Sequence, residues 1–205
     1  MTCSWQWQHP MKPVRINEDV FHNLRLKDYQ MERKFDGFRI LAVSENSGIK
    51  LWTRHRRVLK APPSLLKELR SMGLPAGTVL DGEIWSAKKR GGWETTDDKE
   101  CRVTFWDCVH TGHNLLTKAP IEERRDALHS LLGNGCDRVR IVNIMDATSK
   151  NLKTVRKEAV RVRTEGNARS GFIHGVVLKR KGSPRRDHPN RSVAHPDWLK
   201  IVFWP

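Results

Sequence analysis

The chain lacks the sequence features of several common protein classes. No apolar run approaches the roughly 20 residues that a membrane-spanning helix needs. The four cysteines contain no C-x-x-C pair, so we expect no disulfide framework and a cytoplasmic location. The sequence also contains no G-x-x-x-x-G-K-[ST], no G-x-G-x-x-G and no H-E-x-x-H, so the usual P-loop, dinucleotide and zinc-protease sites are excluded.

Acidic residues are too few to balance the basic ones. The 205 residues include 38 Lys and Arg but 23 Asp and Glu, which gives a formal net charge of +15. The basic residues are spread over apparently folded segments, such as residues 54–57, rather than gathered in one tail. This distribution favours a nucleic acid as partner. The length and a hydrophobic fraction of 38% fit one folded domain over residues 1–205.

Short segments rich in β-branched and aromatic residues predict more strands than helices. The expected strands cover residues 39–43, 49–53, 79–85, 102–109, 138–144, 172–180 and 198–203. The expected helices cover residues 64–72, 121–132 and 149–163, with Ser64 and Ser149 as caps and charged residues 122–125 on a solvated side. Residues 44–48 and 181–196 are expected to be polar loops. Since strands and helices do not alternate regularly, the predicted fold class is α+β with mainly antiparallel sheets.

A zinc site can be assembled on paper from one part of the chain. The possible ligands are Cys101, Cys108, His110 and His113. Their spacing matches no usual zinc finger, and both cysteines fall on or beside an apparent core strand. We therefore expect no zinc site here.

The most informative segment covers residues 32–39. Lys34, Asp36, Gly37 and Arg39 lie within six residues at a corner between strands. A nearby cation lowers the pKa of a lysine and frees its amine for nucleophilic attack. Gly37 would permit a positive φ or the close approach of a ligand. A surface β-turn with incidental charges would have the same composition, so this pattern alone leaves both interpretations open.

Further motifs in the right order resemble the covalent nucleotidyltransferase superfamily and, within it, the adenylation domain of ATP-dependent DNA ligases. The first motif, K-x-D-G-x-R, is complete from Lys34 to Arg39. The later matches are Thr53-Arg54, Asp81-Gly82-Glu83, Phe105-Trp106-Asp107, Gly175, Val177 and Lys179 of E-G-x-V-x-K, and Trp198-Leu199-Lys200 of W-L-K-x-K. Two positions depart from the family: His174 replaces a glutamate, and Val202 replaces a lysine.

The resemblance implies two mainly antiparallel sheets flanked by helices, with a nucleotide cleft between them. It also implies that Lys34 attacks the α-phosphate of ATP, expels pyrophosphate and carries AMP. The AMP would pass to a 5′-phosphate at a nick in double-stranded DNA, and a 3′-hydroxyl would then seal the strand. The implied cofactors are ATP and Mg²⁺ or Mn²⁺, and the protein is expected to act as a monomer away from membranes, in DNA repair or replication.

The same resemblance implies a role for each matched residue. Cations suited to the phosphates and ribose are Arg39, Arg54, Lys179 and Lys200. Glu32 would accept a hydrogen bond from the adenine amino group, and Asp36 would orient Lys34. Trp106 would stack on one face of adenine, with Val176 or its neighbour Val177 on the other, because adjacent strand residues face opposite sides. The alternative role for Trp106 is that of an ordinary core aromatic.

The resemblance also implies a metal site. Glu83 resembles the carboxylate that contacts the sugar and helps to hold the metal, although it could also be a strand-end carboxylate paired with an arginine. His174 stands where the second metal carboxylate is usual. A neutral imidazole is a poor ligand for Mg²⁺, whereas Mn²⁺ tolerates nitrogen better.

Three alternatives remain open from the sequence. An RNA ligase or an RNA capping guanylyltransferase would use the same lysine chemistry. A catalytically weak or inactive nucleic-acid-binding module would explain His174, Val202 and the absence from residues 1–205 of the C-terminal OB-fold domain that such ligases usually carry. Retention of Lys34 and Glu83 favours an active enzyme.

Overall fold

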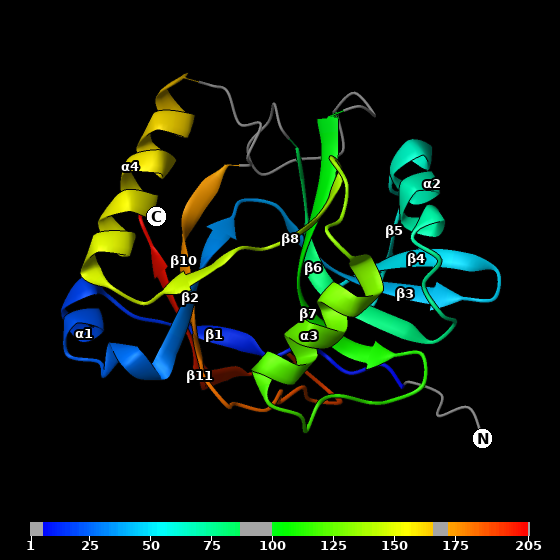
Figure 1. Cartoon of the computed structure of the whole chain (residues 1–205), viewed down its shortest axis with the longest axis horizontal. Coiled ribbons are helices and arrows are strands. Elements are labelled where there is room, and N and C mark those ends of the chain that lie inside the picture. The colour runs from blue at the N-terminus through cyan, green and yellow to red at the C-terminus, as the bar shows by residue number, and fades with distance from the viewer. Residues whose placement is uncertain (1–5, 87–99, 166–171, 205) are drawn as a thin grey trace.

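The computed structural model describes residues 6–86, 100–165 and 172–204, which form two β-sheets with helices on their outer faces (Figure 1). The strands are β1 (Lys12–Arg15), β2 (Tyr29–Phe35), β3 (Phe38–Glu45), β4 (Gly48–Thr53), β5 (Val58–Leu59), β6 (Thr78–Ser86), β7 (Cys101–Thr111), β8 (Val139–Ile141), β9 (Ile144–Asp146), β10 (Ile173–Arg180) and β11 (Ala194–Val202). The helices are α1 (Glu18–His22), α2 (Pro63–Ser71), α3 (Ile121–Leu132) and α4 (Ser149–Glu165), with a short 3₁₀ turn η1 (Leu26–Asp28).

The described strands form a five-stranded sheet in the order β1-β11-β10-β2-β9 and a six-stranded sheet in the order β5-β4-β3-β6-β7-β8. Only the β1–β11 and β7–β8 pairs are parallel among the strand pairs of the described residues. The predicted α+β class with mainly antiparallel sheets is confirmed. No helix in the described ranges is long and apolar enough to cross a membrane.

The five-stranded sheet is covered on its outer face by α4 and α1 (Figure 1). Val176 and Leu178 of β10 are buried there against the apolar stripe of α4. Because side chains alternate along a strand, their neighbours Val177 and Lys179 point to the opposite face, toward the six-stranded sheet. Alternate side chains of β10 therefore point into the core and into the space between the sheets.

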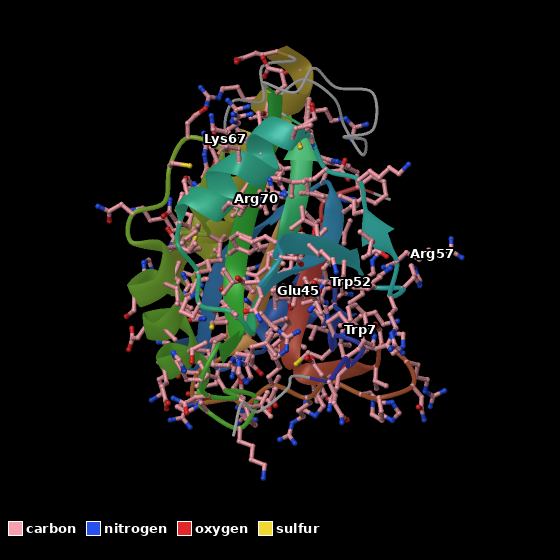
Figure 2. All side chains as sticks on the ribbon, turned by 90° about the vertical axis from the view of Figure 1, so that its right-hand side faces the viewer. Trp7, Glu45, Trp52, Arg57, Lys67 and Arg70 are labelled. Carbon is pink, nitrogen blue, oxygen red and sulfur yellow. The ribbon has the colours of Figure 1, made fainter. Side chains whose placement is uncertain are left out.

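The six-stranded sheet is covered on its outer face by α2 and α3. Leu65 and Leu69 of α2 and Leu128 of α3 are fully buried against it. Each such side chain contributes on the order of 2 kcal/mol of transfer free energy, which holds both helices on the sheet. Trp7 and Trp52 contact each other, with their ring centroids 5.9 Å apart. They pack against a hydrophobic cluster separate from the one that α2 covers, and Figure 2 shows them away from that helix.

Several predicted boundaries were wrong. The polar loop at 44–48 is a two-residue turn, because β3 and β4 pair up to Glu45 and Gly48, and Gly48 takes a φ of 123°. The predicted strand 138–144 is divided into β8 and β9, which join different sheets. The predicted loop 181–196 ends early, since β11 begins at Ala194.

The predicted helix caps were also displaced. The backbone N–H of Asn151 donates to the side chain of Thr148, so Thr148 caps α4 in place of Ser149. Ser64 lies inside α2, whose cap position is Pro62 and has no side-chain hydrogen bond. Errors of one or two residues are typical of helix ends.

Candidate active site between the two sheets

A cleft with a cavity of about 540 Å³ opens between the facing sides of the sheets. This is within the range of pockets that hold small molecules. The predicted site residues that line it are Glu32, Lys34, Gly37, Arg39, Arg54, Glu83, Trp106, Lys179 and Lys200. They come from six segments that are distant in sequence, so the fold brings the predicted residues together.

The register of the five-stranded sheet explains how these side chains are aligned. Val177 of β10 pairs with Glu32 of β2 on one side and with Lys200 of β11 on the other. Directly paired residues point to the same face, so these three form a row across the floor of the cleft. Lys34 begins the next row, where it pairs with Gly175.

Of the two candidate valines, Val177 lines the cleft and Val176 does not. Val176 is fully buried in the core beneath the sheet. The prediction of Val176 as a nucleotide contact is therefore wrong, because the alternation of β10 turns it toward α4. Trp106 lines the cleft from the six-stranded sheet.

Glu32 is buried and held by two cations. Its Oε2 lies 2.8 Å from Nζ of Lys179, and its Oε1 lies 3.0 Å from Nη1 of Arg125. Each carboxylate oxygen can accept more than one hydrogen bond, so Glu32 keeps acceptor capacity toward the cleft. Burial lowers the pKa of Lys179, against the opposing effect of the carboxylates of Glu32 and Asp107. Lys179 was predicted to meet phosphates, whereas the structure pairs it with Glu32.

Arg125 was assigned to the solvated side of its helix, together with Arg124, and both are buried. Arg125 lies four residues after Ile121 and three before Leu128, so it belongs to the apolar stripe of α3 by helical spacing. The helical spacing of Arg125 therefore indicated a buried position. The prediction missed it because four consecutive charged residues, 122–125, suggest a solvent-exposed side.

Glu83 lies against the turn that carries the first motif. Burial raises its pKa to about 7, although Lys34 and Arg39 act in the opposite direction. The backbone N–H of Gly37 donates to Glu83. A Cβ at Gly37 would lie 2.3 Å from the backbone oxygen of Ile84, so this position requires glycine. The reason differs from the prediction, because φ is not positive and the close neighbour is strand β6 rather than a ligand.

Asp36 and His174 do not line the cleft but face each other beside it. Oδ1 of Asp36 lies 3.8 Å from Nδ1 of His174, and Nε2 of His174 lies 3.1 Å from the backbone oxygen of Trp204. His174 falls at a register shift between β10 and β2, which turns it out of the row that holds Lys34. The doubtful placement of His174 at the metal is therefore not supported. The orientation of Lys34 by Asp36 stays a prediction.

The acidic groups of the cleft fit a metal ion with few protein ligands. Among the described residues, no three His, Cys, Asp or Glu side chains are grouped as a metal site. Glu32 is taken by two cations, which leaves Glu83 as the carboxylate available. Mg²⁺ is commonly held by one or two carboxylates together with substrate phosphates and water, so Glu83 fits this mode. Cys101 and Cys108 are buried in the core of the six-stranded sheet.

Behind the cleft, a buried chain of charges fixes Arg39. Its Nε and Nη2 donate to Asp81 over 3.0 and 2.6 Å. Arg185 donates to both Asp81 and Asp107, over 2.7 and 3.0 Å, and Arg124 donates to Asp107 over 2.7 Å. Burial alone would raise the pKa of both carboxyl groups, but the arginines hold them well below their usual range. Arg185 was missed, because an arginine in a polar, proline-containing loop carries no pattern that separates it from its neighbours.

A lysine, a carboxylate and several cations in a cleft between two helix-covered sheets fit the adenylation domain of an ATP-dependent DNA ligase. The chain belongs to the family described as "ATP dependent DNA ligase domain", whose sequence profile matches residues 10–201. The resemblance drawn from the motifs is confirmed.

Individual relatives support the same family. The chain is 26% identical over 187 residues to the SPbeta prophage-derived DNA ligase-like protein LigB of Bacillus subtilis, covering 86% of this chain and 62% of LigB. Its fold is similar to mycobacterial DNA ligase D complexed with ATP and MES, with a TM-score of 0.71 at 21% identity, covering 98% of this chain and 62% of that one. An archaeal ATP-dependent RNA ligase shares the fold with a TM-score of 0.52 at 16% identity, covering 93% and 47%. The chain thus spans less than two thirds of each relative.

Proposed function

We propose that this chain adenylates itself on Lys34 with ATP and passes the AMP to the 5′-phosphate of a nick in double-stranded DNA, which is then sealed. The observation that supports this most is the convergence of Lys34, Glu83 and Lys200 in one cleft with Trp106 and Val177. In the first step, the neutral amine of Lys34 forms a bond to the α-phosphorus. The bond from that phosphorus to the α,β-bridging oxygen breaks, pyrophosphate takes the electron pair, and the amine proton passes to solvent.

Base recognition follows from the two walls of the cleft. Trp106 and Val177 would hold the base between them, and Glu32 would accept a hydrogen bond at its edge. Adenine offers an amino group there, whereas guanine offers a carbonyl oxygen that a carboxylate repels. Lys179 and Arg125 fix the Glu32 carboxylate in place. Glu32 can therefore accept a hydrogen bond from the base without rearranging.

The phosphates would be neutralised by the cations that line the cleft. Lys200 and Arg54 would contact phosphate oxygens, and Arg39, held by Asp81, would contact the ribose or the α-phosphate. Phosphoryl transfer depends mainly on such positioning and charge neutralisation. A Mg²⁺ or Mn²⁺ ion held by Glu83 and phosphate oxygens would add positive charge at the reacting phosphate.

Nick sealing needs a site for the 5′-phosphate of the nick and a surface that binds the DNA duplex. The AMP moves from Lys34 to the 5′-phosphate, and the 3′-hydroxyl then displaces AMP as the leaving group. Basic side chains at residues 54–57 and on α4 are suited to the duplex backbone, because phosphate contacts position DNA without reading its sequence. A role in DNA repair or replication in the cytoplasm, as a monomer, belongs to the same proposal.

The test is incubation with α-labelled ATP or GTP and Mg²⁺ or Mn²⁺, followed by denaturing electrophoresis. We expect label from ATP on the wild type and none on Lys34→Ala. A nicked duplex with a DNA or an RNA strand at the nick then separates DNA ligase from RNA ligase. Label from GTP would indicate capping chemistry, and no label with either nucleotide would favour the inactive binding module.

A further inference from the structure

The rim of the cleft on the side of β1 carries basic side chains that no motif predicted. Lys12 lines the cleft. Arg15 lines a second pocket, but it pairs directly in the β1–β11 ladder with Lys200, which lines the cleft. Burial lowers the pKa of Lys200, and the charges of Lys34, Arg15, Lys12 and Arg54 lower it further. The cations are therefore close enough to repel one another. We call Lys12, Arg15 and Lys200 the β1–β11 strip.

The strip differs from two other cations of the cleft, Arg39 and Lys179, in having no carboxylate partner. Arg39 is paired with Asp81, and Lys179 is paired with Glu32. Within residues 6–86, 100–165 and 172–204, no ion pair neutralises Lys12, Arg15 or Lys200. A cleft rim lined by charges of one sign attracts a polyanion, whose binding would relieve the repulsion among these cations.

The position of the strip relative to Lys34 indicates which polyanion. The strand order is β2, β10, β11, β1, so Lys34 on β2 and the strip lie on opposite sides of β10. Adjacent strands are about 4.8 Å apart, which puts β11 and β1 roughly 10 and 14 Å from β2. In an in-line displacement the leaving group departs on the side opposite the nucleophile. An α-phosphate held between β2 and β11 and attacked by Lys34 would release its leaving group toward the strip.

We propose that Lys12 and Arg15, together with Lys200, bind the β- and γ-phosphates of ATP and the departing pyrophosphate. This assignment rests on the proposed function and adds two residues of β1 to the site. DNA backbone phosphates have the same chemistry, but Lys12 and Lys200 line the same cavity as Lys34, which favours the nucleotide.

The test compares the double variant Lys12→Ala/Arg15→Ala with Lys67→Ala/Arg70→Ala. The control removes the same charge from exposed positions of α2, on the outer face of the six-stranded sheet (Figure 2). The rate of Lys34 labelling is measured against ATP concentration, and loss of AMP from labelled protein against pyrophosphate concentration. We expect the β1 variant to need about tenfold more ATP and about tenfold more pyrophosphate. The α2 variant should match the wild type.

Two results would overturn the assignment. One is a β1 variant that matches the wild type in both assays but binds nicked duplex about tenfold more weakly, which would give the strip to DNA. The other is an equal loss in both double variants, which would show a general charge effect. Calorimetric titration with inorganic tripolyphosphate keeps the test independent of the proposed function. If the wild type takes no label, weaker tripolyphosphate binding by the β1 variant alone still supports the strip, and equal binding by both variants contradicts it.

Discussion

At the scale of single residues, two adjacent valines have opposite environments. Val176 is buried beneath the sheet, and Val177 lines the cleft. The motif spacing could place a valine in the site but could not decide between them, because the direction of alternation depends on which face of β10 meets α4. The same limit applies to Arg125, which only its helical spacing could have marked as buried.

Substituting each valine with alanine distinguishes a role in the core from a role in the site. Val176→Ala should lower the free energy of unfolding by about 2 kcal/mol, because it leaves a cavity, and should not change the ATP dependence of labelling. Val177→Ala should have the smaller effect on unfolding but raise the ATP concentration needed for half-maximal labelling. Denaturant unfolding and the labelling assay measure the two effects. The reverse pattern would mean that β10 faces the other way.

Glu83 predicts a pH dependence with a defined sign. Its pKa is raised from 4.5 to about 7 in the folded protein, so the folded state binds this proton more tightly than the unfolded state does. The stability that the protonated Glu83 contributes is therefore lost as pH rises from 4.5 through about 7. Glu83→Gln, which stays uncharged, should gain stability relative to the wild type between about pH 5 and about pH 8. Thermal unfolding with a chelator present measures this, and a difference that is constant with pH would contradict it.

At the scale of elements, the segment before β11 is fixed by charge rather than by apolar contacts. Arg185 joins Asp81 of β6 to Asp107 of β7, and Arg124 of α3 completes the chain. The sequence predicted a loop at 181–196 from its polar composition, and most of it is one. It could not predict the buried arginine, because burial of a charge depends on partners from other elements.

Asp81→Asn tests this charge network. Removing one partner from a buried pair should cost about 3 to 5 kcal/mol of unfolding free energy at neutral pH. Arg39 and Arg185 hold the pKa of Asp81 below its usual value of 3.8, against the effect of burial. The stabilisation by the Asp81 carboxylate is therefore present above that pH and is lost as pH falls further. The difference in unfolding free energy between Asp81→Asn and the wild type should therefore become smaller at acidic pH.

Asp137→Asn is the matched control. Asp137 pairs with Arg102 and Arg140, but its side chain is 72% exposed. Its loss should change the free energy of unfolding by less than about 1 kcal/mol. Denaturant unfolding of both variants decides the matter, and equal losses would show that the buried network contributes no more than a surface pair.

At the scale of the whole molecule, two sheets with separate cores meet at the cleft. The fold class could be predicted because the strand segments were evident in the sequence and their motifs came in the family order. The sheet to which each strand belongs could not, as β8 and β9 show. Residues 138–144 looked like one strand because both halves have the same composition, and only long-range pairing separates them.

The net charge of +15 predicts how the chain should bind DNA. Binding of a nicked duplex should weaken by orders of magnitude between about 50 and about 200 mM salt, because each neutralised phosphate releases counterions. Binding should depend little on duplex sequence. Fluorescence anisotropy over a salt series measures both. Affinity that barely changes with salt would show that the basic surface does not hold the DNA backbone.

The most direct test of the account is to locate the bound nucleotide on the chain. The protein is incubated with ATP and Mg²⁺ or Mn²⁺, digested, and its peptides are sequenced by mass spectrometry. The account predicts one AMP adduct, on Nζ of Lys34, which disappears in Lys34→Ala. An adduct on Lys200 or Lys12, or none in a folded protein with either metal, would contradict the assignment of Lys34 as the nucleophile of this cleft.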